Sequence, residues 1–349
     1  MEIIEIPSNQ YEKSGSKKEI KMADYSKYRD DSWLTNNVWG KWGADDEIGA
    51  LNEVTPANIL EAATYIKQGK IYDLETIRFH GMPVWDGHCG FEMLTYASPM
   101  GRRNMSKNSD YPAAYAWHKE GGWLADANNK YMTDANTEML IAPLHCGTHI
   151  DGFCHITTGE DAHWYNGFNV SEHWGDYGPL KTDSPTIPPM MLRGVLLDIA
   201  GYKGLDHVEP NYGITAEDVE KCAEWEGVEL RKNDCVLLRC GERWPQLDNC
   251  PGAGMTLEAA RCLIEGHGAV LLGDDMVAFE MNNADGTMSY PGHCHPVHHY
   301  CLTQQGVHFM EAVQLDELAK DKVYEFCFMV APNKMKGGTG MFIRPIAIV

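Results

Sequence analysis

The sequence predicts an α/β fold: a single domain in which helices flank a central mixed sheet. From about residue 190 onward, short continuous apolar runs alternate with helical periodicity, which is the pattern of buried strands covered by helices. A hydrophobic content of 44% over 349 residues suffices for one large core or two modest ones. Because no linker, repeat or low-complexity tract interrupts the chain after Trp33, we expect one domain over residues 31–349 behind a polar N-terminal arm, residues 1–30.

The expected elements follow one another in chain order. The first helix begins at Pro56 behind the N-cap Thr55, with apolar residues at helical spacing. A strand-like stretch at residues 71–80 precedes a long aromatic, turn-rich segment that extends to residue 140. Apolar strand patterns then alternate with helical ones, giving a strand at 193–200, a helix at 215–227, a strand at 234–241, a helix at 257–268, a strand at 269–275, a helix at 297–306 and a strand at 307–313.

The charge balance argues against several classes of partner. Lys and Arg number 29 against 50 Asp and Glu, giving a net charge of −21 that repels phosphate backbones and anionic bilayers. The N-terminus lacks the basic start and the apolar stretch of a signal peptide, and no apolar run reaches the length of a membrane span. We therefore expect a cytoplasmic protein without nucleic-acid or membrane partners, whose eleven cysteines are mainly reduced thiols.

The aromatic segment before residue 140 is a candidate pocket wall or lid, because an irregular stretch of that length inside a compact domain is usually functional. Core packing is nevertheless the more frequent role for any one ring. As a pocket wall, the segment favours a planar or ring-containing small-molecule substrate. The candidate substrate-binding residues are Trp85, Tyr115, Trp117 and Trp123.

Residues 143–155, PLHCGTHIDGFCH, concentrate three histidines, one aspartate and two cysteines. Imidazole and carboxylate together suit Zn²⁺, Mn²⁺ or Fe²⁺. A regular helix fails, since Asp151 would leave the face that His145 and His149 share, and in a regular strand the two histidines would lie about 13 Å apart. A turn at Cys146 and Gly147 followed by an extended segment brings the three side chains together, with the cysteines facing away as packing residues.

The stretch HCGTHIDGFCH resembles the signature H-x-G-T-H-x-D-x-x-x-H of the cyclase-like metal-dependent hydrolases, the family of bacterial kynurenine formamidase, isatin hydrolase and the trans-dienelactone hydrolases. Similar stretches occur along nearly the whole chain, namely WGADDEIGALN, RGVLLDIA, DCVLLRCGER, HYCLTQQGVHFMEAVQLDEL and KMKGGTGMFIRPIAIV. The resemblance implies the cyclase-like, swivelling β/β/α fold and assembly as a homodimer or homotetramer.

The resemblance also implies roles for the residues of the motif. His145, His149 and Asp151 would bind metal, and His155 would be the catalytic acid/base. The implied cofactor is a divalent metal, Zn²⁺ or Mn²⁺, with one or two ions per subunit.

The histidine-rich stretch HCHPVHH, residues 293–299, has four histidines in seven positions, so it is an alternative metal cluster, and it also contains the candidate for a second metal position. In the formamidases a histidine and a glutamate twelve residues apart complete that position, and His299 and Glu311 match the spacing. His298 is one residue out of register and ranks second. Pro296 is expected to open the helix, which leaves the two earlier histidines in the preceding loop near the pocket mouth. Whether Glu311 ligates or orients water stays open.

The resemblance implies a metal-dependent hydrolase that opens a cyclic amide, imide or lactone, or cleaves an aryl formamide, through metal-activated water with His155 as general acid/base. Two alternatives share the ligand set: a metal-dependent lyase or isomerase that stabilises an enolate, and a non-catalytic metal or small-molecule binding protein. The presence of His155 favours catalysis over binding alone, because a binding site needs ligands but no proton shuttle.

Overall fold

The computed structural model describes residues 25–97, 130, 131, 133 and 135–349. Its largest sheet contains nine strands: β1 (Ile71–Asp73), β4 (His149–Asp151), β7 (Met190–Leu197), β9 (Cys235–Leu238), β11 (Leu271–Asp274), β12 (His308–Glu311), β13 (Glu325–Val330), β14 (Gly340–Phe342) and β15 (Ile346–Ile348). Their spatial order is β1-β15-β13-β7-β9-β11-β12-β4-β14. The four strands from β7 to β12 are parallel and the outer pairs are antiparallel, so the predicted mixed sheet is confirmed.

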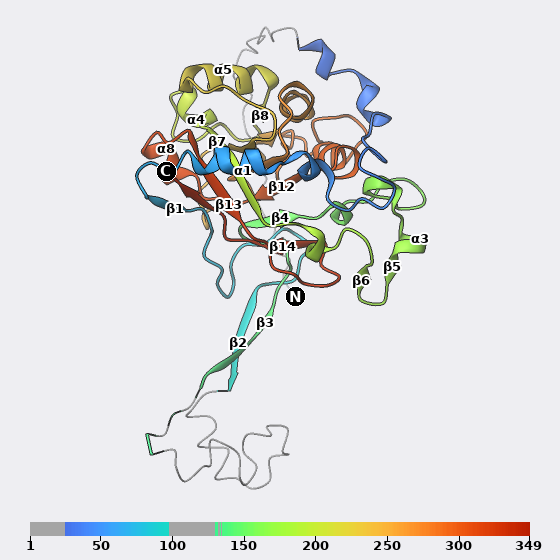
Figure 1. Ribbon diagram of the computed structural model, residues 1–349, viewed down its shortest axis with the longest axis vertical. Helices are drawn as coiled ribbons and strands as arrows, with labels where there is room; N and C mark the ends of the chain where they lie inside the picture. The colour runs from blue at the N-terminus through green and yellow to red at the C-terminus, as the bar shows by residue number, and fades with distance from the viewer. Residues whose placement is uncertain (1–24, 98–129, 132, 134) are drawn as a thin grey trace, which may run out of the picture.

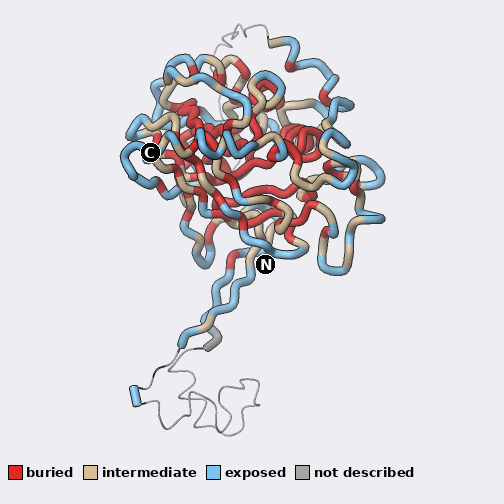
Figure 2. The backbone as a smooth tube through the Cα atoms, viewed as in Figure 1, coloured by how far each residue is buried: buried red, intermediate tan, exposed pale blue. Residues whose placement is uncertain are grey.

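Helices and short helical turns cover this sheet (Figure 1). The described α-helices are α1 (Pro56–Ala63), α3 (Val170–His173), α4 (Ile199–Tyr202), α5 (Ala216–Glu226), α6 (Leu257–Arg261), α7 (Pro296–His298) and α8 (Asp316–Lys320). Two π-helical segments, η9 (Cys262–Gly266) and η10 (His299–Gln304), continue α6 and α7. Helix α1 lies against β7 and β13, and α5 packs on β7 and α6. Buried residues, red in Figure 2, fill the interior between these layers.

Three pairs of short strands complete the structure. They are β2 (Glu92–Ala97) with β3 (Thr137–Ile141), β5 (Trp174–Gly175) with β6 (Gly178–Pro179), and β8 (Gly213–Ile214) with β10 (Gly254–Met255). The β2–β3 ribbon leaves the body of the molecule as a long projection (Figure 1). The 3₁₀ turns are η1 (Ser26–Tyr28), η2 (Asp31–Leu34), η3 (Gly49–Glu53), η6 (Phe153–His155), η7 (Tyr165–Gly167) and η8 (Ser184–Thr186).

The four parallel strands form the centre of the core. Strands β9, β11 and β12 are buried at every position, which explains their mainly apolar sequence, and the polar residues at their ends, Asp274, His308 and Glu311, are buried as well. Helices connect them as parallel strands require: α5 lies between β7 and β9, α6 between β9 and β11, and α7 between β11 and β12. Their carboxyl ends therefore lie along one edge of the sheet, the edge at which open α/β sheets bind ligands.

The two longest helices begin where local sequence signals place them. Thr55 caps α1 in a reciprocal capping box with Asn58, and Thr215 caps α5 in the same way with Asp218. Helix α5 ends at Gly227, whose φ of 71° lies in the left-handed region that glycine favours. Both starts were predictable because a cap depends only on residues within one helical turn.

Three predicted elements differ in extent or type from the structure. The strand expected at residues 71–80 ends with β1 at Asp73, because the chain then leaves the sheet edge and the Thr76 N–H donates to Thr148 Oγ1 at 2.8 Å. The helices expected at residues 257–268 and 297–306 begin as α-helix but continue as π-helix. A π turn holds one residue more than an α turn, so it changes which side chains face the core.

The N-terminal arm expected over residues 1–30 is attached at its described end. Tyr28 is buried, and Arg29 Nε donates to Glu258 Oε2 at 2.5 Å. Residues 1–24 lie outside the described part of the chain.

All eleven cysteines are free and nine of them are buried, which agrees with the expectation of reduced thiols. Over the ranges that the structure describes, no helix combines the length and the apolarity that a bilayer crossing demands.

A buried ion pair provides a test of the sheet's packing. Arg193 on β7 donates from Nη1 to Asp234 Oδ2 at 2.6 Å, and both side chains are almost completely buried. We expect Asp234→Ala to lower the free energy of unfolding by about 1.5–3 kcal/mol, because it removes one charge-assisted hydrogen bond from a buried guanidinium that keeps Glu325 as its other partner. The exposed pair of Arg344 and Asp73 is the control, and Asp73→Ala should cost only about 0–1 kcal/mol. Equal denaturation midpoints for the two variants would contradict this packing.

Candidate metal centre

The motif at residues 143–155 adopts the turn and extension that its sequence predicts. Gly147 has a φ of 59°, and a Cβ there would lie only 2.7 Å from Thr76 Oγ1, so the turn requires glycine. The chain then enters β4, which pairs antiparallel with both β12 and β14. The turn folds His145 back towards the strand that carries His149 and Asp151.

Two of the predicted ligands, His145 and His149, lie close to the carboxylate of the third, Asp151. His145 Nδ1 lies 2.7 Å from Asp151 Oδ1, and His149 Nε2 lies 3.4 Å from the same oxygen. The candidate ligand atoms of the three residues all lie within 4.8 Å of one another. His149 Nδ1 is 2.8 Å from the Gly147 carbonyl, so Nδ1 donates to that oxygen and Nε2 is left to face the cluster.

His155 faces Oδ2, the other oxygen of the Asp151 carboxylate. It ends the 3₁₀ turn η6, its ring stacks on His145 with centroids 3.9 Å apart, and its Nε2 lies 3.8 Å from Asp151 Oδ2. Burial lowers the pKa of His155 to about 3. The ring is therefore neutral near pH 7 and has a nitrogen lone pair that can accept a proton.

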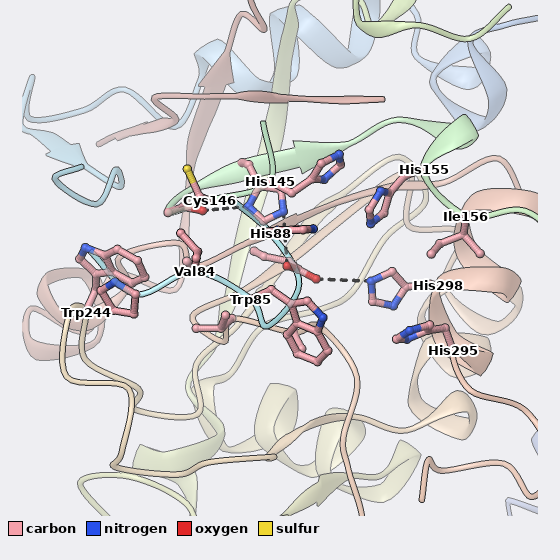
Figure 3. Close-up of a pocket in the computed structure, with 17 residues that line it drawn as sticks. Val84, Trp85, His88, His145, Cys146, His155, Ile156, Trp244, His295 and His298 are labelled. Carbon is pink, nitrogen blue, oxygen red and sulfur yellow. Dashed lines mark hydrogen bonds and ion pairs between the residues drawn. The ribbon is translucent and has the colours of Figure 1, made fainter. Parts of the chain in front are cut away.

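Glu311 and one helical histidine complete the cluster from the neighbouring elements. Glu311 is the cross-strand partner of His149, and its Oε2 lies 3.4 Å from His149 Nε2. His298 Nε2 lies 3.5 Å from Glu311 Oε1 and 3.9 Å from Asp151 Oδ2. Figure 3 shows His298 approaching the cluster from the side opposite to His145.

His299 ranked first for the second metal position, but the neighbouring His298 lies in the cluster instead. His299 does not face the cluster: its Nδ1 lies 2.8 Å from His293 Nε2, and its ring packs against Trp33. Successive helical residues point about 100° apart, so only one of His298 and His299 can face Asp151. His298 precedes Glu311 by thirteen residues instead of twelve, and the π-helical segment η10 between them accommodates an extra residue.

Pro296 opens α7 as predicted. Of the two histidines before it, His295 lines the pocket and His293 pairs with His299. Cys154 is buried and bonds the Thr182 carbonyl, which is a packing role. Cys146 is also buried, but it borders the pocket.

The cluster has the electrostatics of a cation site. Burial opposes ionisation of Asp151, but the neighbouring histidines together hold the pKa of that carboxyl well below its usual range. Burial likewise opposes charge on His149 and His298, yet nearby carboxylates raise both pKa values above the ordinary one. These histidines take up protons against buried carboxylates, and a divalent ion would supply the same compensating charge.

An unpartnered oxygen tests whether the residues fit such an ion. Asp151 is 1% exposed, and its Oδ2 is enclosed without a hydrogen-bond partner among the described residues. Buried polar atoms are normally satisfied, so an enclosed carboxylate oxygen between His155 and His298 marks a position for a ligand. Imidazole nitrogens with carboxylate oxygens form the donor set that Zn²⁺ and Mn²⁺ accept. The donor set therefore fits a divalent ion.

A cavity of about 180 Å³ opens over the cluster. A cavity of about 150 Å³ accepts benzene, so this space suits roughly one ring. Its apolar walls include Val84, Trp85, Ile156 and Trp244 (Figure 3), together with Val277. Neither lysine nor arginine occurs among the described residues that line it. A second cavity of about 430 Å³ shares Val84, Trp85 and Val277 with the first. Trp85 thus stands between the metal-side space and a larger neighbouring one.

The predicted substrate-binding residues divide into two groups. Trp85 lines the cavity and is 40% exposed. Tyr115, Trp117 and Trp123 lie outside the described residues.

Several residues that line the cavity were not predicted from the sequence, among them the aromatic residues Trp244 and His88. Trp244 follows β9, so the rule that ligands bind beyond the carboxyl ends of parallel strands could have found it. His88 lies in an irregular segment, and no sequence pattern marks it.

The fold and this cluster define an α/β protein with a candidate metal centre at the edge of a mixed sheet. Residues 72–281 match the Cyclase family model, described as "Putative cyclase". That span is more than half of the chain, and the chain belongs to the cyclase family. A comparison with curated proteins finds no match.

Solved structures share the fold. A crystal structure described as a novel cyclase is 26% identical with a TM-score of 0.73, and the match covers 91% of this chain and 99% of that chain. Isatin hydrolase A from Labrenzia aggregata, bound to benzyl benzoate, is 19% identical with a TM-score of 0.54, covering 84% and 99%. An isatin hydrolase bound to the product analogue thioisatinate is 15% identical with a TM-score of 0.51, covering 85% and 99%. The predicted cyclase-like fold is confirmed.

Gly340 on β14 packs directly against His145, so a larger residue at this position would disturb the cluster. A Cβ at this position would lie 2.4 Å from His145 Cε1 and 2.7 Å from the Ile150 carbonyl oxygen. We expect Gly340→Ala to displace His145 and to weaken Zn²⁺ or Mn²⁺ binding by about 10- to 100-fold, as measured by calorimetric titration. Gly90→Ala is the control, because its new Cβ would approach no atom closer than 3.8 Å. Unchanged affinity in a folded Gly340→Ala protein would mean that His145 is not a ligand.

Proposed function

We propose that this protein is a metal-dependent hydrolase that opens a cyclic amide, imide or lactone, or cleaves an aryl formamide. The single observation that carries the proposal is the enclosed, unpartnered Oδ2 of Asp151, which lies between His155 and His298, two residues that line the cavity. Membership of the cyclase family supports it. The isatin hydrolases that share the fold act on a cyclic amide by name, which supports a ring-opening reaction.

In this proposal His145, His149 and Asp151 hold one ion, which is Zn²⁺ or Mn²⁺. His298 and Glu311 would hold a second ion together with Asp151, because the two oxygens of that carboxylate face different sets of partners. A bound divalent ion supplies Lewis acidity and makes water a stronger acid near neutral pH.

His155 transfers the proton. Its ring is held by stacking on His145, and about a quarter of its side chain is exposed at the cavity. The neutral imidazole accepts a proton from the attacking water and returns it to the leaving nitrogen or oxygen. No other described residue of the cavity combines a neutral imidazole with contact to Asp151 Oδ2, since His298 is held by carboxylates.

The cavity favours a neutral substrate with one ring at the scissile bond. The space over the cluster has the volume of one ring, and its walls are mainly apolar. Trp85 and Trp244 provide flat aromatic surfaces, which suit a planar carbonyl compound. Larger substituents would extend past Trp85 into the second cavity.

We expect metal content and turnover to separate between two sets of variants. His155→Ala should keep its metal and lose turnover by about two to four orders of magnitude, the usual contribution of a general acid/base. The double variant His145→Ala with His149→Ala should lose its metal as well. Elemental analysis and the initial rates of hydrolysis of a cyclic imide, a lactone and an aryl formamide measure the two quantities.

His207→Ala is the matched control, because this histidine bonds a backbone carbonyl away from the described lining of the cavity. Product formed with ¹⁸O from labelled water distinguishes hydrolysis from a lyase or isomerase reaction. A full equivalent of tightly bound metal in the double variant would overturn the ligand assignment.

Trp85 is expected to select for substrates that contain a ring. Trp85→Ala should lower kcat/KM for ring substrates by roughly two- to tenfold, the loss that corresponds to an aromatic contact of about 0.5–1.5 kcal/mol. A short linear amide should change less because it cannot stack. Trp225→Ala is the control, since Trp225 is a half-exposed tryptophan on α5 that packs on Tyr202 and Tyr324. Equal losses for ring and linear substrates would show that Trp85 does not select for rings.

A further inference from the structure

Glu280 is a buried glutamate on the side of His298 that faces away from Asp151. It is 2% exposed, and its Oε1 accepts a hydrogen bond from His298 Nδ1. The same carboxylate accepts the backbone N–H groups of Val297 at 3.1 Å and of His298 at 3.4 Å. Glu280 therefore holds both the backbone and the ring of His298.

We propose that Glu280 is a positioning residue that fixes the His298 imidazole with Nε2 towards Asp151 and Glu311. Glu280 would thereby set the affinity of the second metal position, which His298, Glu311 and Asp151 form. The proposal rests on the proposed function, because it assigns His298 as a ligand. It concerns a residue outside the family motif, in the irregular segment between β11 and α7.

The two nitrogens of the His298 ring have different partners. An imidazole that donates from Nδ1 keeps its lone pair on Nε2 when it is neutral, so the partner of Nδ1 decides which nitrogen can bind metal. Here Nδ1 donates to Glu280, and Nε2 lies 3.5 Å from Glu311 Oε1 and 3.9 Å from Asp151 Oδ2. A carboxylate behind a histidine also makes that histidine a stronger base and a stronger ligand.

A second arrangement uses the same residues differently. Glu280, His295 and His298 have candidate ligand atoms within 4.8 Å of one another and could hold an ion between them. That ion would need Nδ1 of His298, and the ring would then have to lose both protons in order to serve two ions. The oxygens of Glu280 are already occupied by N–H donors, whereas Asp151 Oδ2 has no partner among the described residues. The observations therefore favour Glu280 as the group behind the ligand.

The experiment compares Zn²⁺ binding in the full-length protein, with affinities measured by competition against a chelator. We expect Glu280→Gln to keep the number of bound ions and to weaken the second binding step by about tenfold, because an uncharged amide oxygen still accepts the hydrogen bond. Glu280→Ala removes the acceptor and should weaken it by about 100-fold. Nitrogen-15 spectra of the histidine rings should show the His298 Nδ1 proton retained in Glu280→Gln and lost in Glu280→Ala.

Glu242→Gln is the matched control. Glu242 is 4% exposed and accepts backbone N–H groups from Asn249 and Cys250, but none of the hydrogen bonds found for it among the described residues comes from a histidine. Its substitution should leave both metal affinities unchanged. Should Glu280→Ala fail to fold, as judged by circular dichroism, Glu280→Gln decides the outcome alone.

Two results would overturn the proposal. Wild-type affinity in both Glu280 variants would show that Glu280 does not act on the metal centre. If the Glu280→Gln variant and the His295→Ala variant each lose one whole ion, Glu280 is a metal ligand and not a positioning residue. Binding that depends on Glu280 in a wild-type protein without hydrolase activity would reject the proposed function and keep this inference, while a wild-type protein that binds no Zn²⁺ would reject both.

Discussion

The antiparallel pairing of β4 with β12 on one side and β14 on the other is the constraint on which the candidate site depends. Strand β4 has only three residues, yet all three are buried and two of them are predicted ligands. Its register places His149 opposite Glu311 and Asp151 opposite Gly340. Because β12 belongs to the parallel core, the motif is anchored to the most buried part of the molecule. A shift of one residue would turn both ligands to the other face of the sheet.

This anchoring brings buried carboxylates together, and their charge needs compensation. Asp151, Glu311 and Glu280 are each less than 10% exposed, and Asp274 at the end of β11 interacts with the charge of Glu311. Burial first, and the charge of Glu311 second, raise the pKa of Asp274 well above its usual range. The histidines of the cluster offset part of this charge. A divalent ion held by Asp151 would offset more of it, so the electrostatics and the donor set lead to the same conclusion.

The cavity over the cluster takes its walls from segments that are distant in the sequence. Trp244 follows β9 and Val277 follows β11, so both come from the carboxyl ends of parallel strands. Val84 and Trp85 come from the irregular segment before β2, and Val84 lies beside Trp244 (Figure 3). The ligands are thus fixed by the sheet, while loops set the size of the space above them. Loops of this kind let one metal centre serve different substrates within a family.

The sequence alone determined the features that depend on neighbouring residues. The caps of α1 and α5, the buried parallel strands and the turn at Gly147 follow from local patterns, and the signature from His145 to His155 was readable in a single stretch. Only the tertiary structure decided that His298 and not His299 faces Asp151, since a π-helical segment changes the register between helix and strand. It alone placed Glu280 behind His298, because a contact between residues eighteen positions apart depends on how the segments pack against each other and leaves no periodic trace in the sequence.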